Sequence, residues 1–213
     1  MDASGEHPAG DGTTARDGAD ARDGADARDG ADGVAGLPAG LLTTAYPVTV
    51  ELLLAAPRHR YEGRPADGPA PADGPELHER ITVRAGLGIV GDRFHGHPAH
   101  RQASVTVIGA EPLEALAAEL GIPLDPALTR RNVVLRGVDV EALRGVLFSI
   151  DTGSGPVVLQ GHRAANPCAW MDVAIGPGVF RGMRGRGGIR CEPLTDGVLT
   201  LGPGTLRAAV PLG

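Results

Sequence analysis

Short apolar runs separated by turn residues dominate the chain from about residue 46 onward. Their β-branched and aliphatic content, and the alternation of apolar and polar positions within several of them, predict strands. In chain order the predicted strands are YPVTVELLL (46–54), LHERITVRA (77–85), ASVTVIG (103–109), RNVVLRGV (131–138), VLFSI (146–150), VVLQGHR (157–163), GVLTLG (197–202) and LRAAV (206–210). The DTGSGP turn between the fifth and sixth runs predicts a β-hairpin.

Helical periodicity is confined to a few short segments. AEPLEALAAELG (110–121) places Leu113, Leu116 and Leu120 on one face, and Gly121 ends it. VEALRG predicts about one helical turn, and PGVFRGMRGRGG (177–188) predicts a short helix that runs into glycines. Many strands with few helices predict a mainly β, barrel-like fold. Strands and helices do not alternate regularly, and no G-x-G-x-x-G joins a strand to a helix, so a Rossmann fold is not expected.

The first part of the chain differs from the rest in composition. Residues 1–33 hold nine acids and three arginines, which accounts for the whole net charge of −6, and residues 15–32 are three copies of ARDGAD. The repeat has no apolar residue larger than alanine, so it predicts disorder. We therefore expect an acidic disordered tail over 1–44 and one folded domain over 45–213, with a flexible Pro/Gly-rich loop at 63–75.

Charge and composition exclude several classes of function. The part of the chain after residue 33 is neutral, which argues against a nucleic-acid surface. The chain contains no lysine, so a pyridoxal phosphate Schiff base and a Walker-type phosphate loop are both excluded. No apolar run is long enough to span a bilayer, and the N-terminus does not resemble a signal peptide. We expect a cytoplasmic protein without a membrane partner, whose two cysteines are reduced thiols.

Cys168, in the stretch ANPCAWMD, carries a reactive thiol and is one of only two cysteines in the chain. Arg163 precedes it at the end of a predicted strand, and an arginine-glycine segment follows it. Positive charge favours a thiolate, which can bind a metal or act as a nucleophile. A small buried core thiol and a disulfide with Cys191 remain alternatives from the residues alone.

Three other clusters have chemical interpretations. His162 and Asp172 flank Cys168 and could form a Cys-His-Asp protease triad, although no family signature accompanies them. HGHPAH (95–100) could ligate zinc or form a solvated loop. Arg130, Arg131 and Asn132 are either surface residues before a strand or a clamp for a phosphate and a heterocycle. The residues alone do not decide between these interpretations.

Taken in order, the segments resemble the MOSC domain, named for the C-terminal domain of molybdenum cofactor sulfurases. The matching elements are GLGIVGDRFHG, RQASVTVIGAE, RRNVVLRGVDVEALRG, VLQGHRAANPC and GPGVFRGMRGRGGIR, followed by GVLTLGPG. They extend over roughly residues 45–210, essentially the whole folded part. The closing element usually reads Gly-Asp in the family, whereas this chain has Gly202-Pro203.

The resemblance implies a β-rich barrel with an essential cysteine, which Cys168 matches. It implies that Cys168 either ligates the molybdenum of molybdenum cofactor or carries sulfur as a persulfide. Arg131, Asn132 and Arg163 are the implied contacts to the pterin and phosphate, and Arg186 of the arginine-glycine segment is a fourth candidate. Asp92 matches a Gly-Asp element whose part is structural or functional.

The implied activity is that of a small molybdenum oxidoreductase, such as one that reduces N-hydroxylated compounds with a separate redox partner. The alternative is a module that carries sulfur or handles the cofactor. Full sulfurases have a pyridoxal phosphate desulfurase domain, which this chain lacks. Sulfur or cofactor is therefore expected to come from another protein.

Overall fold

The computed structural model describes residues 40–212 and confirms the predicted mainly β, barrel-like fold with a few short helices. Most of the predicted tail, 1–39, lies outside the described residues, as does residue 213. The first strand starts at Thr44, two residues before the predicted start. No helix in the described part of the chain has the length and apolar character that a membrane span requires.

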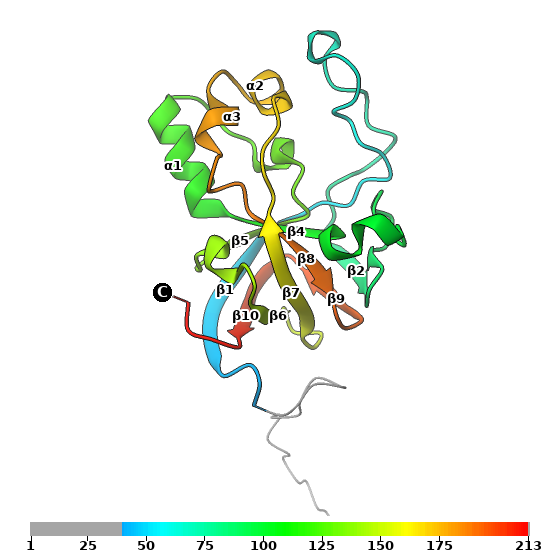
Figure 1. The fold of residues 1–213 in the computed structure, drawn as a ribbon, viewed down its shortest axis with the longest axis vertical. Helices are drawn as coiled ribbons and strands as arrows, with labels where there is room; N and C mark the ends of the chain where they lie inside the picture. The colour runs from blue at the N-terminus through cyan, green and yellow to red at the C-terminus, as the bar shows by residue number, and fades with distance from the viewer. Residues whose placement is uncertain (1–39, 213) are drawn as a thin grey trace, which may run out of the picture. The chain divides into compact units, whose positions relative to one another are not determined.

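Seven strands close into a barrel in the order β1-β10-β6-β7-β8-β4-β5 (Figure 1). Their bounds are β1 Thr44–Leu53, β4 Val105–Gly109, β5 Val133–Arg136, β6 Leu147–Asp151, β7 Val157–Ala164, β8 Ile189–Pro193 and β10 Gly202–Ala208. All neighbouring pairs are antiparallel except β4 and β5. The predicted hairpin is the β6–β7 pair, in which Ile150 lies opposite Val157. A second sheet holds β3 (Gly88–Ile89), β2 (Arg80–Arg84) and β9 (Gly197–Thr200), in that order.

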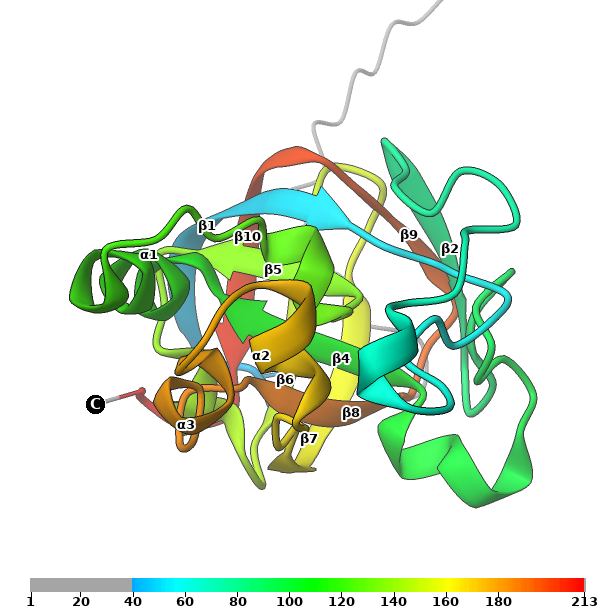
Figure 2. The same ribbon diagram turned by 90° about the horizontal axis from the view of Figure 1, so that it is seen from above.

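The predicted helix forms α1 (Ala110–Leu120), which connects the parallel strands β4 and β5. Gly121 ends α1 in the left-handed conformation, with φ 64°. Two shorter helices, α2 (Trp170–Ala174) and α3 (Val179–Gly182), lie with α1 at one end of the barrel (Figure 1). Seen from this end, α2 lies between α3 and the segment that connects β1 to β2 (Figure 2). VEALRG forms a 3₁₀ turn, Val140–Leu143, and three further 3₁₀ turns are Pro65–Asp67, Pro98–Ala103 and Pro126–Thr129.

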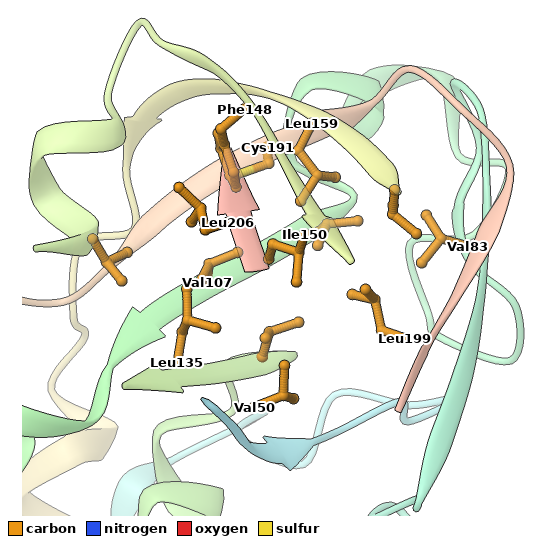
Figure 3. Packing of buried hydrophobic residues seen from close by; sticks show 14 of the residues in the cluster. Val50, Val83, Val107, Leu135, Phe148, Ile150, Leu159, Cys191, Leu199 and Leu206 are labelled. Carbon is orange, nitrogen blue, oxygen red and sulfur yellow. The ribbon is translucent and has the colours of Figure 1, made fainter. Parts of the chain in front are cut away.

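Two apolar cores follow from the alternation of side chains along the strands. Inward residues fill the barrel, among them Val107, Leu135 and Phe148 (Figure 3). The adjoining residues Ile108 and Val134 belong instead to a second cluster beneath the helices. This second cluster also contains Trp170 and Met171 of α2, Val179 of α3 and Met183, which follows α3. It therefore fixes the chain shortly after Cys168 and around the start of the arginine-glycine segment, residues 181–188.

Several short elements were not predicted from the pattern, among them β3, β8 and α2. Strand β8 was missed because IRCEP is short and follows glycines, although Ile189 and Cys191 are buried while Arg190 and Glu192 are not. Helix α2 was missed because five residues are too few for a periodic signal. Helix α2 begins two residues after Cys168, and β8 pairs with β7 up to Ala164, shortly before this cysteine.

Candidate functional site

Cys168 lies in the loop Ala165–Cys168, which we call the cysteine loop, between β7 and α2. Its side chain is exposed, and it is a free thiol. The other cysteine, Cys191, is a free thiol that is fully buried in the barrel core. The disulfide alternative is therefore wrong, and the buried-thiol alternative applies to Cys191 rather than Cys168. Burial raises the pKa of the Cys191 thiol, which keeps it protonated and unreactive.

Helix α2 fixes the far end of the cysteine loop. The Met171 amide donates to the Cys168 carbonyl at 3.0 Å, and Trp170 and Met171 are buried in the second core. The Tyr61 ring stacks on Trp170, with ring centroids 5.5 Å apart. The Tyr61 hydroxyl donates to the Leu128 carbonyl at 2.6 Å, and burial raises its pKa to about 12. The β1–β2 segment thus braces α2, a role that no sequence pattern indicated.

Arg131 donates hydrogen bonds to backbone carbonyls in and near the cysteine loop. Its Nη2 donates to the Ala165 carbonyl at 2.5 Å and its Nε to the Gly187 carbonyl at 2.9 Å. Burial and the charge of Arg190 lower the pKa of Arg131 to about 10, while Cys168 acts in the opposite direction. Arg131 therefore stays charged at neutral pH, next to Cys168.

Asn132 follows in sequence but serves the fold. Its Oδ1 accepts from the amide and the hydroxyl of Thr106, at 2.9 and 2.7 Å. Its Nδ2 donates to the Leu54 carbonyl at 3.0 Å and to Asp92 Oδ2 at 3.1 Å. The side chain is buried and its amide group is occupied by these four bonds. Asp92 likewise accepts from backbone amides of Ala56 and Phe94, which favours the structural interpretation of both residues.

Arg163 lies at the end of β7 and Arg190 at the start of the paired strand β8, next to the Ala164–Ile189 pair. Neither arginine forms an ion pair with a carboxylate of residues 40–212. Burial and the charge of Arg163 lower the pKa of Arg190. Two cations are therefore close together, and no carboxylate within residues 40–212 is paired with either of them.

Arg93 is a third cation of this region, paired only at long range with Asp92, and sequence reasoning passed over it in favour of Asp92. Its side chain is 15% exposed, and its Cζ lies 4.5 Å from the Phe94 ring centroid. Among the described residues, no acceptor lies within hydrogen-bonding distance of its buried Nε and Nη1. The nearest carboxylate oxygen, Asp92 Oδ2, is 3.9 Å from Nη1. Burial lowers the pKa of Arg93.

We call Arg93, Arg163 and Arg190 the arginine group. Burial, His97 and the three members of this group all lower the pKa of His100, which places the group around one histidine. The charges of Arg190, Cys168 and Arg93 also act on Arg131. The arginine group and the thiol thus lie in one region, which we call the positive region and which also contains Arg131.

Arg186, the fourth predicted cofactor contact, lies between α1 and α3. Its Nη1 and Nη2 donate to the two carboxylate oxygens of Glu119 at 2.7 and 2.5 Å. Its Nε donates to the Gly182 carbonyl at 2.6 Å. The guanidinium is therefore engaged in joining the helices.

The two remaining sequence hypotheses gain no support. His162 Nε2 lies 3.5 Å from Glu192 Oε2, and Asp172 accepts from the Phe180 amide, so neither is arranged to activate Cys168. His97 and His100 are edge to face, with ring centroids 4.7 Å apart. Over residues 40–212, no group of three or more His, Cys, Asp or Glu side chains is placed to hold a metal ion.

A family model described as MOSC domain matches residues 91–204, more than half of the chain. The chain belongs to the MOSC domain family. The match begins just before Asp92 and contains Arg93, Arg131, Arg163, Cys168 and Arg190. The MOSC domain resemblance seen in the sequence is therefore confirmed, and the positive region described above lies within the domain.

A solved structure of low sequence identity shares the fold of this MOSC domain. The YuaD protein from Bacillus subtilis is 17% identical with a TM-score of 0.60, and the match covers 79% of this chain and 99% of that one. YiiM from Escherichia coli is also 17% identical, with a TM-score of 0.48 over 80% of this chain and 72% of that one. The comparison with curated proteins found no match.

Proposed function

We propose that this MOSC protein binds molybdenum cofactor, with the Cys168 thiolate on the metal and the arginine group on the phosphate. The observation that carries the proposal is an exposed thiol near three arginines that the described residues leave incompletely paired. Arg163 and Arg190 form no ion pair there, and Arg93 Nε and Nη1 have no hydrogen-bond acceptor. A thiolate is a soft metal ligand, and a guanidinium matches the geometry of phosphate oxygens. An anionic ligand that carries a soft metal would therefore fit both the Cys168 thiolate and the arginine group.

Arg93 provides the test of fit. A buried guanidinium without an acceptor is costly, because it has given up water without gaining a hydrogen bond. Asp92 cannot relieve this cost, since its Oδ2 already accepts from Ala56 and Asn132. A bound oxyanion would supply the missing acceptor, so the residues present fit an anionic cofactor.

The four cofactor contacts predicted from the sequence differ in whether their side chains already bond to protein groups. Arg163 has no partner in the described part of the chain and joins Arg93 and Arg190 as a phosphate contact in the proposal. Arg131, Asn132 and Arg186 stay predictions as direct contacts, and their hydrogen bonds to protein groups support structural roles. A neutral heterocycle could reach the Asn132 amide only by displacing its four bonds.

The activity that we propose is reduction of N-hydroxylated compounds. The bound cofactor would supply two-electron transfer at molybdenum. Cys168 would hold the metal, the arginine group would fix the phosphate, and His100 would remain neutral at physiological pH because its pKa is lowered. Electrons would come from a separate redox protein. We propose a cytoplasmic location, where the Cys168 thiol stays reduced.

Metal analysis tests the proposal. Full-length protein produced in a host that makes molybdenum cofactor should contain molybdenum and pterin, and Cys168→Ala should lose most of the molybdenum. Cys191→Ala is the matched control, because that thiol is buried in the barrel core, and it should retain the metal. Equal molybdenum in wild type and Cys168→Ala, or none in wild type, would refute cofactor binding through this thiol.

A second candidate function is sulfur transfer, favoured by the exposure of Cys168. In this step the Cys168 thiolate attacks the terminal sulfur of a desulfurase persulfide, forms Cys168–S–SH after protonation, and releases the donor cysteine as thiolate. Incubation with a cysteine desulfurase and free cysteine should then add one sulfur to Cys168 and none to Cys191, as seen by mass spectrometry. An unmodified Cys168 under these conditions contradicts the sulfur-carrier function.

A further inference from the structure

We infer that Arg131 is a positioning residue that holds the cysteine loop in place and charges its surroundings, instead of gripping a ligand. The inference rests on the proposed function only in taking Cys168 as the functional thiol. It assigns Arg131 a role through the backbone, and it leaves ligand contact to the arginine group.

The hydrogen bonds of Arg131 join three separate segments. Nη2 donates to the carbonyls of Ala165 and Asn166, at 2.5 and 3.4 Å. Nε donates to Gly187, at 2.9 Å, and Nη1 donates to Thr129, at 3.2 Å. One planar guanidinium thus ties the cysteine loop to the end of the arginine-glycine segment and to the turn before β5.

The backbone on the other side of Ala165 is fixed as well. The Ala165 amide donates to the Gly188 carbonyl at 2.7 Å. The Gly188 amide in turn donates to Glu141 Oε1 at 2.7 Å. Both polar groups of Ala165 are therefore held, one by Arg131 and one by Gly188, three residues before the thiol.

Close packing explains why this arrangement tolerates no side chain at Gly187. A Cβ at Gly187 would lie 2.7 Å from the Ala165 carbonyl oxygen and 3.4 Å from Pro167 Cδ. The cysteine loop would have to move away to accommodate it. Gly187→Ala therefore disturbs the same loop as an Arg131 variant, without changing any charge.

Donor number argues against a ligand contact by Arg131. A guanidinium has five N–H donors, and the four hydrogen bonds above already use most of them. The group is partly buried, stays charged because its pKa remains at about 10, and interacts with Cys168. Its charge therefore lies close to the thiol while its hydrogen bonds hold the loop.

The test uses full-length protein without cofactor, so it does not depend on molybdenum. Hydrogen exchange at residues 165–171 should accelerate at least about 10-fold in Arg131→Met and in Gly187→Ala, because the opening free energy falls by roughly 1.4 kcal/mol or more. Arg136→Met is the matched control, since Arg136 lies on β5, is partly exposed, and pairs with Glu51 and Glu114. It should leave exchange in the loop unchanged.

Alkylation of Cys168 separates the charge from the hydrogen bonds. The rate with anionic iodoacetate, divided by the rate with neutral iodoacetamide, should fall several-fold in Arg131→Met and recover in Arg131→Lys. Lysine restores the charge but cannot reach three segments at once, so Arg131→Lys should keep the fast exchange. A merely structural arginine would not change this rate ratio.

Two results would overturn the inference. One is unchanged exchange in the loop of Arg131→Met together with loss of cofactor from that variant, which would make Arg131 a ligand contact. The other result applies if Arg131→Met does not fold. It is unchanged hydrogen exchange at residues 165–171 in Gly187→Ala. Wild-type protein that lacks molybdenum would refute the proposed cofactor but leave both readouts standing.

Discussion

Replacing Gly188 by alanine is expected to lower the free energy of unfolding by at least about 3 kcal/mol. The added Cβ would lie 2.2 Å from the Val107 carbonyl oxygen and 2.9 Å from Ile108 Cβ. Both neighbours belong to β4 and cannot shift without disturbing the barrel. Gly188 also has φ +83°, a conformation that costs a residue with a side chain.

Gly185→Ala is the matched control for this prediction. Gly185 lies in the same arginine-glycine segment with φ +80°, but nothing lies within 4 Å of its added Cβ. It should lose only about 1 kcal/mol, from the backbone conformation alone. The melting temperature should thus fall by roughly 2–4 °C for Gly185→Ala and by at least about 8 °C for Gly188→Ala. Similar losses in the two variants would show that the contact with β4 does not matter.

The second large effect is expected at Glu76, which pairs with a buried arginine. Arg130 Nη1 and Nη2 donate to the two carboxylate oxygens of Glu76 at 2.5 and 2.8 Å, and the side chains are only 5% and 12% exposed. Glu76→Ala would leave the Arg130 cation buried without its partner. Because such a loss typically costs 3–5 kcal/mol, we expect a decrease of about 3 kcal/mol in the free energy of unfolding, measured by denaturant titration.

The same pair predicts how stability depends on pH. Burial acts to raise the pKa of Glu76, but the hydrogen bond and charge of Arg130 outweigh it and lower the pKa. A carboxyl with a lowered folded-state pKa contributes stability above its unfolded pKa, which is about 4.3, and loses it as the pH falls further. The difference between wild type and Glu76→Ala should be complete at pH 6 and shrink below about pH 4.

Asp73→Ala is the control for Glu76. Asp73 pairs with Arg58 in the same segment, but the two side chains are 42% and 72% exposed. Exposed pairs contribute about 0–1 kcal/mol, so this variant should change stability little at any pH. If both variants had equal effects, burial of the Arg130–Glu76 pair would not be what stabilises the segment.

The fold was largely predictable because local patterns and the barrel agree. The apolar runs marked most of the strands, and the leucine spacing with Gly121 marked α1. Strand β8 escaped because the preceding glycines suggested a turn, yet it completes the barrel between β7 and β4. The order of strands in the barrel was not predictable, since it depends on pairing between segments that are distant in sequence.

The site was only partly predictable. Cys168 and Arg163 stood out because a thiol and a cation occur close together at a strand end. Arg190 and Arg93 reach the same region from β8 and from the turn after β3, and no spacing links them to Cys168. Asn132 and Arg186 looked available for a ligand because a sequence does not show that Asp92 and Glu119 already occupy them.

The sequence by itself determined the MOSC family and the mainly β class, and it singled out Cys168 as the candidate functional cysteine. These depend on residue order and on side-chain periodicity, which are local properties. Only the tertiary structure decided that Cys168 is exposed and Cys191 buried, and which arginines have partners. Exposure and pairing depend on which distant segments the fold brings together. Arg131 therefore donates hydrogen bonds to the cysteine loop, whereas Arg163 and Arg190 have no carboxylate partner within residues 40–212.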